Sequence, residues 1–220
     1  MTTVWQATTR GLTVLLLGAL LGAPMGAAAK PDPDPEKAQA TVRDVTDRML
    51  EVLRKDLDEV DDEAGFLQRR VEEIVAPSLD FITMTKLVVG RYWRDASDDQ
   101  KRALVTEFRE LLLRTYAGSL QQYDNEQLEL LPLQPGERDD RVKVRSRVIQ
   151  SDGADVAVNY SLRFHDGEWK VYDIVIDGIS MVTNYRSTFS NEIRTSGVDG
   201  LVSTLRAKNR ENETMRAGSQ

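Results

Sequence analysis

The spacing of apolar residues changes twice along this chain, and that change limits the fold more than any other feature. Over residues 38–57 and 98–122, apolar side chains recur every three or four positions, which predicts amphipathic helices. Over residues 141–176 they alternate with polar side chains, which predicts half-buried strands, and the helical spacing returns after residue 181. The order predicts an α+β fold, with an antiparallel sheet of about four strands covered by several helices.

The expected strands are short and sequential. They are predicted at 141–148, 156–164 and 168–176, with a tight turn at Asp166-Gly167 and a further strand within 127–133. Shorter helices are expected at 63–76 and 81–88, the second with Leu87 facing inward. Ser97 and Gln100 have the spacing of a capping box at the start of the long helix. After that helix and the strands, a helix broken at Gly197 is expected to close the domain.

The chain divides into four predicted parts. Residues 1-29 combine Arg10, an apolar run and the small residues Ala27 to Ala29, which is the order of a secretory signal peptide. Alternating prolines predict an extended linker at 30-35. Residues 36-208 form the single expected domain, and the polar residues 209-220 are expected to be a flexible tail.

Composition excludes several classes of function. The chain has no cysteine and one histidine, His165, which leaves no credible disulfide, zinc or haem site. The formal net charge is −7, and removing Arg10 with the signal peptide makes it −7 − 1 = −8. An acidic chain is poorly suited to bind nucleic acid through its phosphates. We therefore expect neither a metal nor a cofactor. We also expect a monomer.

Three features leave a choice between structure and chemistry. Gly178-Ile179-Ser180 begins like a hydrolase nucleophile elbow, but the chain offers no plausible histidine base. Asp173 interrupts an apolar strand, where it is either ion-paired with an arginine such as Arg186 or a general base in a pocket. The basic row at 141–147 is either a solvated strand face or a contact to phosphate. Periodicity alone does not distinguish a packed core from a ligand cavity between sheet and helices.

Residues 89–96 (VGRYWRDA), 115–117 (TYA), 169–186 (WKVYDIVIDGISMVTNYR) and 197–201 (GVDGL) carry a family resemblance. Together they resemble the Mla-type periplasmic phospholipid-binding proteins, the MlaC-like or toluene-tolerance family, over about residues 36–208. The resemblance implies a nuclear-transport-factor-2-like (NTF2-like) cone with an apolar pocket for acyl chains. It implies phospholipid as the cargo, the periplasm as the compartment, and no chemistry performed on the lipid.

The resemblance also implies partners and a site. The partners are an outer-membrane lipoprotein complex and an inner-membrane ABC-type lipid transport complex with its substrate-binding subunit. The head group is expected at the mouth of the pocket, with Arg145 and Arg147 as candidates to contact it. The expected pocket residues are apolar or aromatic: Phe81, Met84, Phe108, Leu112, Tyr116, Val144, Val156, Val158, Tyr160, Leu162, Ile174, Met181 and Tyr185.

Two other functions remain open on the sequence. One is an NTF2-like enzyme, isomerase- or hydrolase-like, that uses Asp173 or a pocket tyrosine. The other is a lipid-free adaptor that bridges membrane complexes. The type of molecule that co-purifies with the protein distinguishes all three.

Export predicts one cleavage site. Because Ala27 and Ala29 place small residues at both ends of an A-x-A motif next to the apolar run, we expect cleavage after Ala29. Mass spectrometry of the exported protein should show Lys30 as its first residue. Membrane-bound protein that retains Met1 would contradict this prediction.

Overall fold

The computed structural model describes residues 33–55, 63–118, 120, 126–134, 138–150 and 153–217. The chain divides into residues 1–30 and residues 31–220, and all described residues belong to the second unit. The predicted signal peptide at 1-29 and the first residues of the predicted linker therefore lie outside the described residues.

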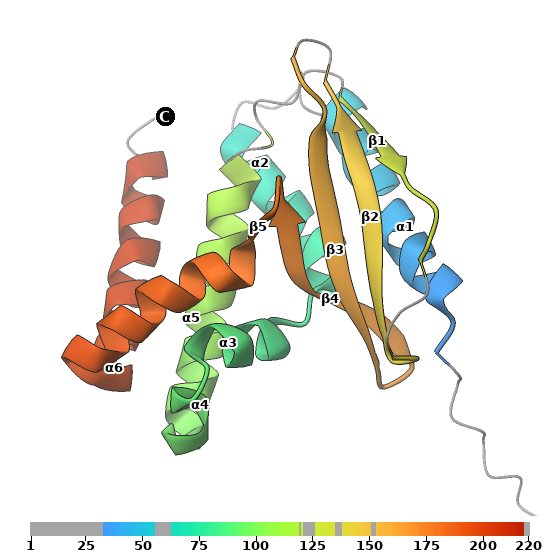
Figure 1. The fold of residues 1–220 in the computed structure, drawn as a ribbon. Coiled ribbons are helices and arrows are strands. Elements are labelled where there is room, and N and C mark those ends of the chain that lie inside the picture. The colour runs from blue at the N-terminus through green and yellow to red at the C-terminus, as the bar shows by residue number, and fades with distance from the viewer. Residues whose placement is uncertain are drawn as a thin grey trace, which may run out of the picture. The chain divides into compact units, whose positions relative to one another are not determined.

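The sheet has five antiparallel strands that follow one another in chain order (Figure 1). They are β1 Gln127–Leu130, β2 Arg141–Ile149, β3 Val156–His165, β4 Glu168–Ile176 and β5 Ile179–Ser180. The four longer strands were predicted, and the α+β class is confirmed. The fifth strand was not predicted, because two residues are too few to show an alternation. It forms after the turn at Asp177 and Gly178, whose φ values of 47° and 82° bring the chain back onto β4.

A β-bulge interrupts the pairing between β3 and β4. Tyr160 lies opposite Ile174, whereas Leu162 lies opposite Val171, so β4 has one extra residue over this stretch. The extra residue changes which side chains share a face of the sheet. Val171 and Ile174 differ by an odd number of positions, yet both lie on the face that α1 covers.

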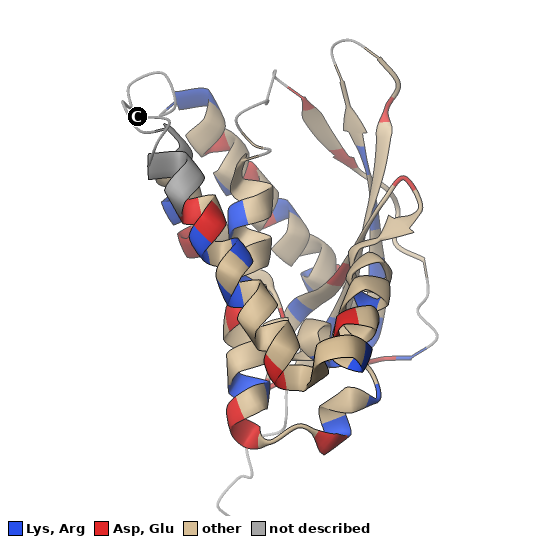
Figure 2. Ribbon diagram, turned by 90° about the vertical axis from the view of Figure 1, so that its left-hand side faces the viewer, with Lys and Arg blue, Asp and Glu red and all other residues tan. Residues whose placement is uncertain are grey.

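The helices occupy both ends of the chain. They are α1 Pro35–Lys55, α2 Glu63–Arg70, a π-helical turn η2 Val71–Val75, a 3₁₀ turn η3 Ala76–Ser78, α3 Phe81–Val89, α4 Tyr92–Asp95, α5 Asp98–Ala117 and α6 Met181–Ala217. Figure 2 shows acidic and basic residues interspersed along these helices. No helix in the described ranges is both long enough and apolar enough to cross a membrane.

The predicted helix caps are present. The Asp80 carboxylate accepts a hydrogen bond of 2.8 Å from the Thr83 backbone N–H at the start of α3. Ser97 and Gln100 form the reciprocal bonds of a capping box at the start of α5. The inward position expected for Leu87 is wrong, since this side chain is 37% exposed. Val89 is buried instead, because the buried arc of α3 is centred on Phe81, Thr85 and Val88.

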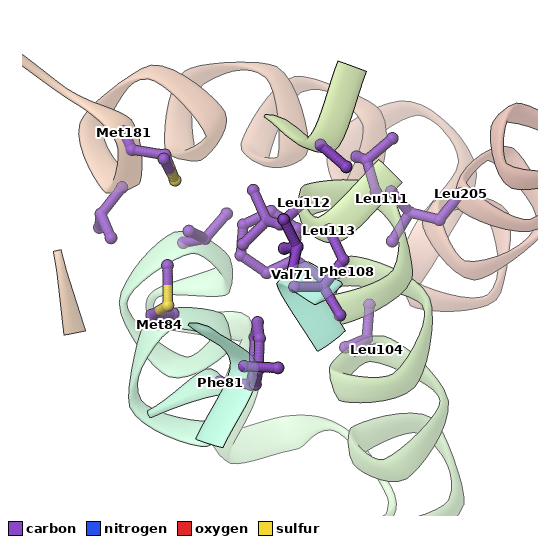
Figure 3. Close-up of a cluster of buried hydrophobic side chains, with 14 of the residues drawn as sticks. Val71, Phe81, Met84, Leu104, Phe108, Leu111, Leu112, Leu113, Met181 and Leu205 are labelled. Atoms are coloured by element: carbon purple, nitrogen blue, oxygen red, sulfur yellow. The ribbon is translucent and has the colours of Figure 1, made fainter. Parts of the chain in front are cut away.

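A helical core forms where α3, α5 and α6 pack against one another (Figure 3). Phe108 of α5 lies at its centre, with its ring 5.2 Å from the rings of both Tyr185 and Phe189 of α6 in edge-to-face geometry. Phe81 and Met84 of α3 and Met181 of α6 are buried in the same cluster. The segment that leads into α3 is also joined to the sheet, because the Asp80 backbone N–H donates to the Val171 carbonyl at 2.8 Å.

Helices extend past both predicted domain boundaries. The first helix begins at Pro35, inside the expected linker, because proline suits the first turn of a helix. At the other end, α6 continues through the expected flexible tail to Ala217. Asn209 is only 6% exposed, and its side-chain amide donates to the Glu107 carbonyl and carboxylate at 3.0 Å each. These polar tertiary contacts do not show in hydrophobic periodicity.

The break in α6 gives a stability prediction. Gly197 has φ 73° and ψ −179°, a region that is essentially restricted to glycine, and Gly118 has φ −63°. An added Cβ meets no atom within 4 Å at either position, so the two sites differ in backbone conformation rather than in space. Gly197→Ala should lower the free energy of unfolding by about 1–3 kcal/mol. Gly118→Ala should leave it unchanged or raise it by up to about 1 kcal/mol. Denaturant unfolding of both variants checks this, and equal effects would contradict it.

Candidate functional site

Helix α1 packs closely on the sheet along only part of its length. Ala38 and Val42, near its start, are buried in a cluster with Val144, Trp169 and Val171. Further along α1 the side chains meet a cavity instead of the sheet. The cavity has a volume of about 550 Å³, within the range of roughly 300–1,000 Å³ that is usual for small-molecule sites.

The cavity wall is mostly aliphatic and comes from α1, the η2–η3 segment, strands β1 to β4 and the end of α5 with the segment after it. Helix α1 contributes Val42, Val45, Met49, Leu50 and Leu53, and η2 with the residue after η3 contributes Val71, Val75 and Leu79. The sheet contributes Leu128, Val148, Tyr160, Val171 and Ile174. Tyr116 near the end of α5 and Leu120, three residues beyond that end, complete the list. Such a wall favours an apolar ligand, since each methylene removed from water gains about 0.8 kcal/mol.

Polar side chains in the wall are few, and two of them are already bonded. Thr41 Oγ1 donates to the Lys37 carbonyl at 2.9 Å, and Ser78 Oγ donates to the Val75 carbonyl at 2.7 Å. Gln127 and Gln150 lie together at one end of the cavity, since Gln127 is in register with Ile149. The wall contains no lysine, arginine or histidine among the described residues.

Three predicted pocket residues line this cavity: Tyr116, Tyr160 and Ile174. Val144 and Leu162 lie on the same sheet face but are buried where α1 contacts the sheet. Val156 and Val158 are half-buried and are not part of the wall. The remaining candidates belong to the helical core or its margin: Phe81, Met84, Phe108, Leu112, Met181 and Tyr185.

Sequence reasoning missed the largest contribution to the wall, which comes from α1. The apolar face of this helix was predicted, but its residues were not proposed for the site. A helix face that packs on a sheet and one that lines a cavity have the same 3.6-residue period. The cavity arises only because Met49, Leu50 and Leu53 lie beyond the region where α1 meets the sheet.

The head-group candidates Arg145 and Arg147 lie on the other face of β2. Their neighbours Val144 and Ser146 are buried, and alternation along the strand points the arginines away from the cavity. Arg145 Nη2 donates to the Pro132 carbonyl at 3.2 Å, and Arg147 lies 3.6 Å from Asp155. Neither arginine is part of the cavity wall.

Asp173 has a structural role, but its partners differ from the arginine that the sequence predicted. Its carboxylate accepts a hydrogen bond from Ser180 Oγ at 2.8 Å and another from the Val182 backbone N–H at 3.1 Å. These bonds tie β4 to the first turn of α6. These two bonds take the place of the expected ion pair between Asp173 and an arginine. The sharp turn into α6 brings the Ser180 hydroxyl and the Val182 backbone N–H to the carboxylate. Asp173 is not part of the cavity wall.

The tyrosines at the cavity are held in their protonated form. Burial raises the pKa of Tyr160 and of Tyr116 above the usual value. Burial also raises the pKa of Tyr185 to about 12, aided by repulsion from the Tyr116 phenolate and by a hydrogen bond to Tyr116. A phenol with a raised pKa is a poor general base near neutral pH. The described residues also contain no His, Cys, Asp and Glu cluster that could hold a metal ion.

The chain is similar in sequence and fold to known proteins. The family model described as MlaC protein matches residues 43–207. The intermembrane phospholipid transport system binding protein MlaC of Haemophilus influenzae is 22% identical over 167 residues, covering 74% of this chain and 78% of that protein. The toluene tolerance protein ttg2D of Pseudomonas putida is 26% identical over 193 residues, covering 86% of this chain and 84% of that protein.

A solved structure has the same fold. It is the phospholipid-binding protein from Ralstonia solanacearum in complex with a phospholipid. The TM-score is 0.73 at 32% sequence identity, and the match covers 80% of this chain and 99% of that chain. The likeness therefore covers most of this chain and nearly all of that one.

The tyrosine pair gives a prediction at high pH. Tyr116→Phe removes the repulsion and the hydrogen bond that raise the pKa of Tyr185, so this pKa should fall from about 12. Because the folded-state pKa is raised, the stability contributed by Tyr185 is complete below its unfolded pKa of about 10 and is lost as the pH rises through 12. Absorbance titration of the tyrosines checks the shift.

Tyr172→Phe is the matched control for this titration. Tyr172 lies outside the cavity, with its ring centre 5.6 Å from the Arg141 guanidinium. Its substitution should leave the transition near pH 12 in place. A transition that Tyr116→Phe does not move would contradict the assignment to the tyrosine pair.

Proposed function

The chain belongs to the MlaC family, and on that basis we propose that it is a periplasmic phospholipid-binding transport protein that holds acyl chains in the cavity beside α1. The apolar cavity of about 550 Å³ carries this conclusion, because it lies within a fold shared with a protein solved in complex with a phospholipid. The cargo is phospholipid, and we propose that no chemistry is performed on it.

The free energy gained when an acyl chain leaves water is consistent with a carrier. A chain of about 15 methylenes gains roughly 12 kcal/mol when it leaves water. A bilayer supplies the same gain, so a cavity that matches the bilayer retains lipid in water and exchanges it at a membrane or partner with little net change.

The enzyme alternative has little support in the site. Asp173 is bonded to Ser180 and to the start of α6, and it does not reach the cavity wall. Tyr116 and Tyr160 do reach the wall, but burial keeps their phenols protonated. The observed side chains therefore favour holding a ligand over moving a proton.

We further propose the route of transport. The protein is exported to the periplasm and carries phospholipid between an outer-membrane lipoprotein complex and an inner-membrane ABC-type complex with its substrate-binding subunit. It acts as a monomer. The family membership and the predicted signal peptide support this route.

A pair of adjacent residues tests the cavity. Val148 of β2 lines it, whereas Ile149 points to the other face and is 39% exposed. Val148→Glu places a carboxyl group among the acyl chains, which costs several kcal/mol of binding. We expect at least about ten-fold less phospholipid per protein. Ile149→Glu, which adds the same charge one residue along, should retain the wild-type amount.

The measurement is organic-solvent extraction of each purified protein, followed by mass spectrometry, with circular dichroism to confirm folding. Co-purified phospholipid in the wild-type protein supports the carrier. A bound polar metabolite would point to the enzyme, and an empty wild-type protein would point to the adaptor. A folded Val148→Glu protein with its normal lipid would show that the acyl chains lie elsewhere.

A further inference from the structure

The face of the sheet that is turned away from α1, here called the outer face, carries a row of cations. The row lies on β2 and consists of Arg141, Lys143, Arg145 and Arg147, which alternate with side chains on the α1 side of the sheet. Arg163 of β3 lies directly opposite Arg141 and extends the positive charge to a second strand. In Figure 1 the outer face is turned toward the viewer, with α1 behind the sheet.

Three cations of the row have no acidic partner. Arg141, Lys143 and Arg145 make no ion pair within the described residues, and the residues opposite the last two are Ser161 and Asn159. Like charges on neighbouring positions of a sheet repel one another. An anionic surface placed over the row would remove this repulsion, so the row favours an anionic partner.

Among the described residues, acidic side chains offset the charge only at the two ends of the row. Glu129 lies opposite Arg147 in the register of β1 and β2, and Asp155 lies 3.6 Å from the same guanidinium. At the other end, Asp80 lies 3.6 Å from Arg163. The middle of the row therefore keeps an uncompensated positive charge.

Exposed apolar side chains border the row at both ends. Ile149 continues the outer face of β2 and is 39% exposed. Helix α3 borders the other end, because Arg163 Nη1 donates to Thr83 Oγ1 at 2.7 Å, and the neighbouring Ile82 is 54% exposed. Cations combined with exposed aliphatic side chains are typical of protein surfaces that bind at the membrane interface, and they favour a bilayer over an acidic protein.

The net charge of the whole chain, −7, does not oppose such binding strongly. At an ionic strength of 0.1 M the Debye length is about 10 Å, so acidic groups on the far side of the domain are screened from a surface that contacts the row. Each Lys or Arg close to an anionic bilayer raises the affinity about five-fold. The local charge of the outer face therefore decides the interaction.

We propose that the outer face of the sheet docks the protein on the surface of an anionic phospholipid bilayer. The cations of the row contact lipid phosphates, and Ile82 and Ile149 contact the boundary between head groups and acyl chains. This inference goes beyond the proposed carrier function, because the face lies on the opposite side of the sheet from the cavity. Docking in this orientation holds the protein at a membrane while α1 stays turned away from the bilayer.

The test compares two double charge reversals in the exported protein. Arg141→Glu/Lys143→Glu changes the row, and Arg69→Glu/Lys208→Glu makes the same change in charge on α2 and α6. All four residues are exposed, so both variants should fold, which circular dichroism checks. Binding is measured by co-sedimentation with vesicles of equal parts phosphatidylglycerol and phosphatidylcholine, and with vesicles of phosphatidylcholine alone.

We expect the wild-type protein to bind the anionic vesicles at least about ten-fold more tightly than the neutral ones, and to lose this preference in roughly 1 M salt. Arg141→Glu/Lys143→Glu should bind the anionic vesicles at least about 25-fold more weakly than the wild-type protein. Arg69→Glu/Lys208→Glu should stay within about two-fold of the wild-type affinity. Equal weakening in both variants would overturn the proposal. A wild-type protein without preference for anionic vesicles would also overturn it and would leave an acidic protein as the partner of the row.

A second measurement tests the orientation without changing the row. Because the chain has no cysteine, Ile149→Cys and Lys208→Cys each provide a single thiol for an environment-sensitive fluorophore. On anionic vesicles, emission from position 149 should move to shorter wavelength, and emission from position 208 should stay unchanged. The same response at both positions would contradict docking through the outer face. Neither measurement depends on what the cavity holds, so the result is independent of the lipid extraction that tests the carrier function.

Discussion

The cavity depends on the packing of the first half of α1 against the sheet. Ala38 has almost no side chain, so the helix backbone approaches Val144 and Trp169 closely at that end. Further along, Met49 and Leu53 project into space that the sheet does not fill. A helix anchored at one end and separated from the sheet at the other leaves an apolar volume without loss of the core. The same helix therefore contributes both to stability and to the site.

One local feature completes the wall opposite α1, and a second holds α6 against the sheet. The β-bulge in β4 turns Val171 and Ile174 to the same side of the sheet. In a strand with regular alternation, only one of the two side chains would face the cavity. The bonds from Asp173 to Ser180 and to the first turn of α6 then hold that helix against β4. Several polar groups near the cavity thus stabilise the scaffold, and most of the wall that faces the cavity is aliphatic.

This arrangement explains how a carrier can lack a catalytic set. In the proposed function, the apolar wall takes the place of the bilayer interior around the acyl chains, and the free energy of binding comes from their removal from water.

The sequence by itself determined the α+β class, the four longer strands, the caps at Asp80 and Ser97, and the break at Gly197, because local periodicity and capping chemistry encode these features. It also carried the family resemblance. Only the tertiary structure decided that Tyr116, Tyr160 and Ile174 line the cavity while Phe108 and Leu112 fill a core, since all five are apolar or aromatic residues on inward faces. The length of α6 was likewise decided by the contact between Asn209 and Glu107. Whether an inward side chain meets another side chain or an open space depends on how far two elements diverge, and a pattern within one element contains no measure of that distance.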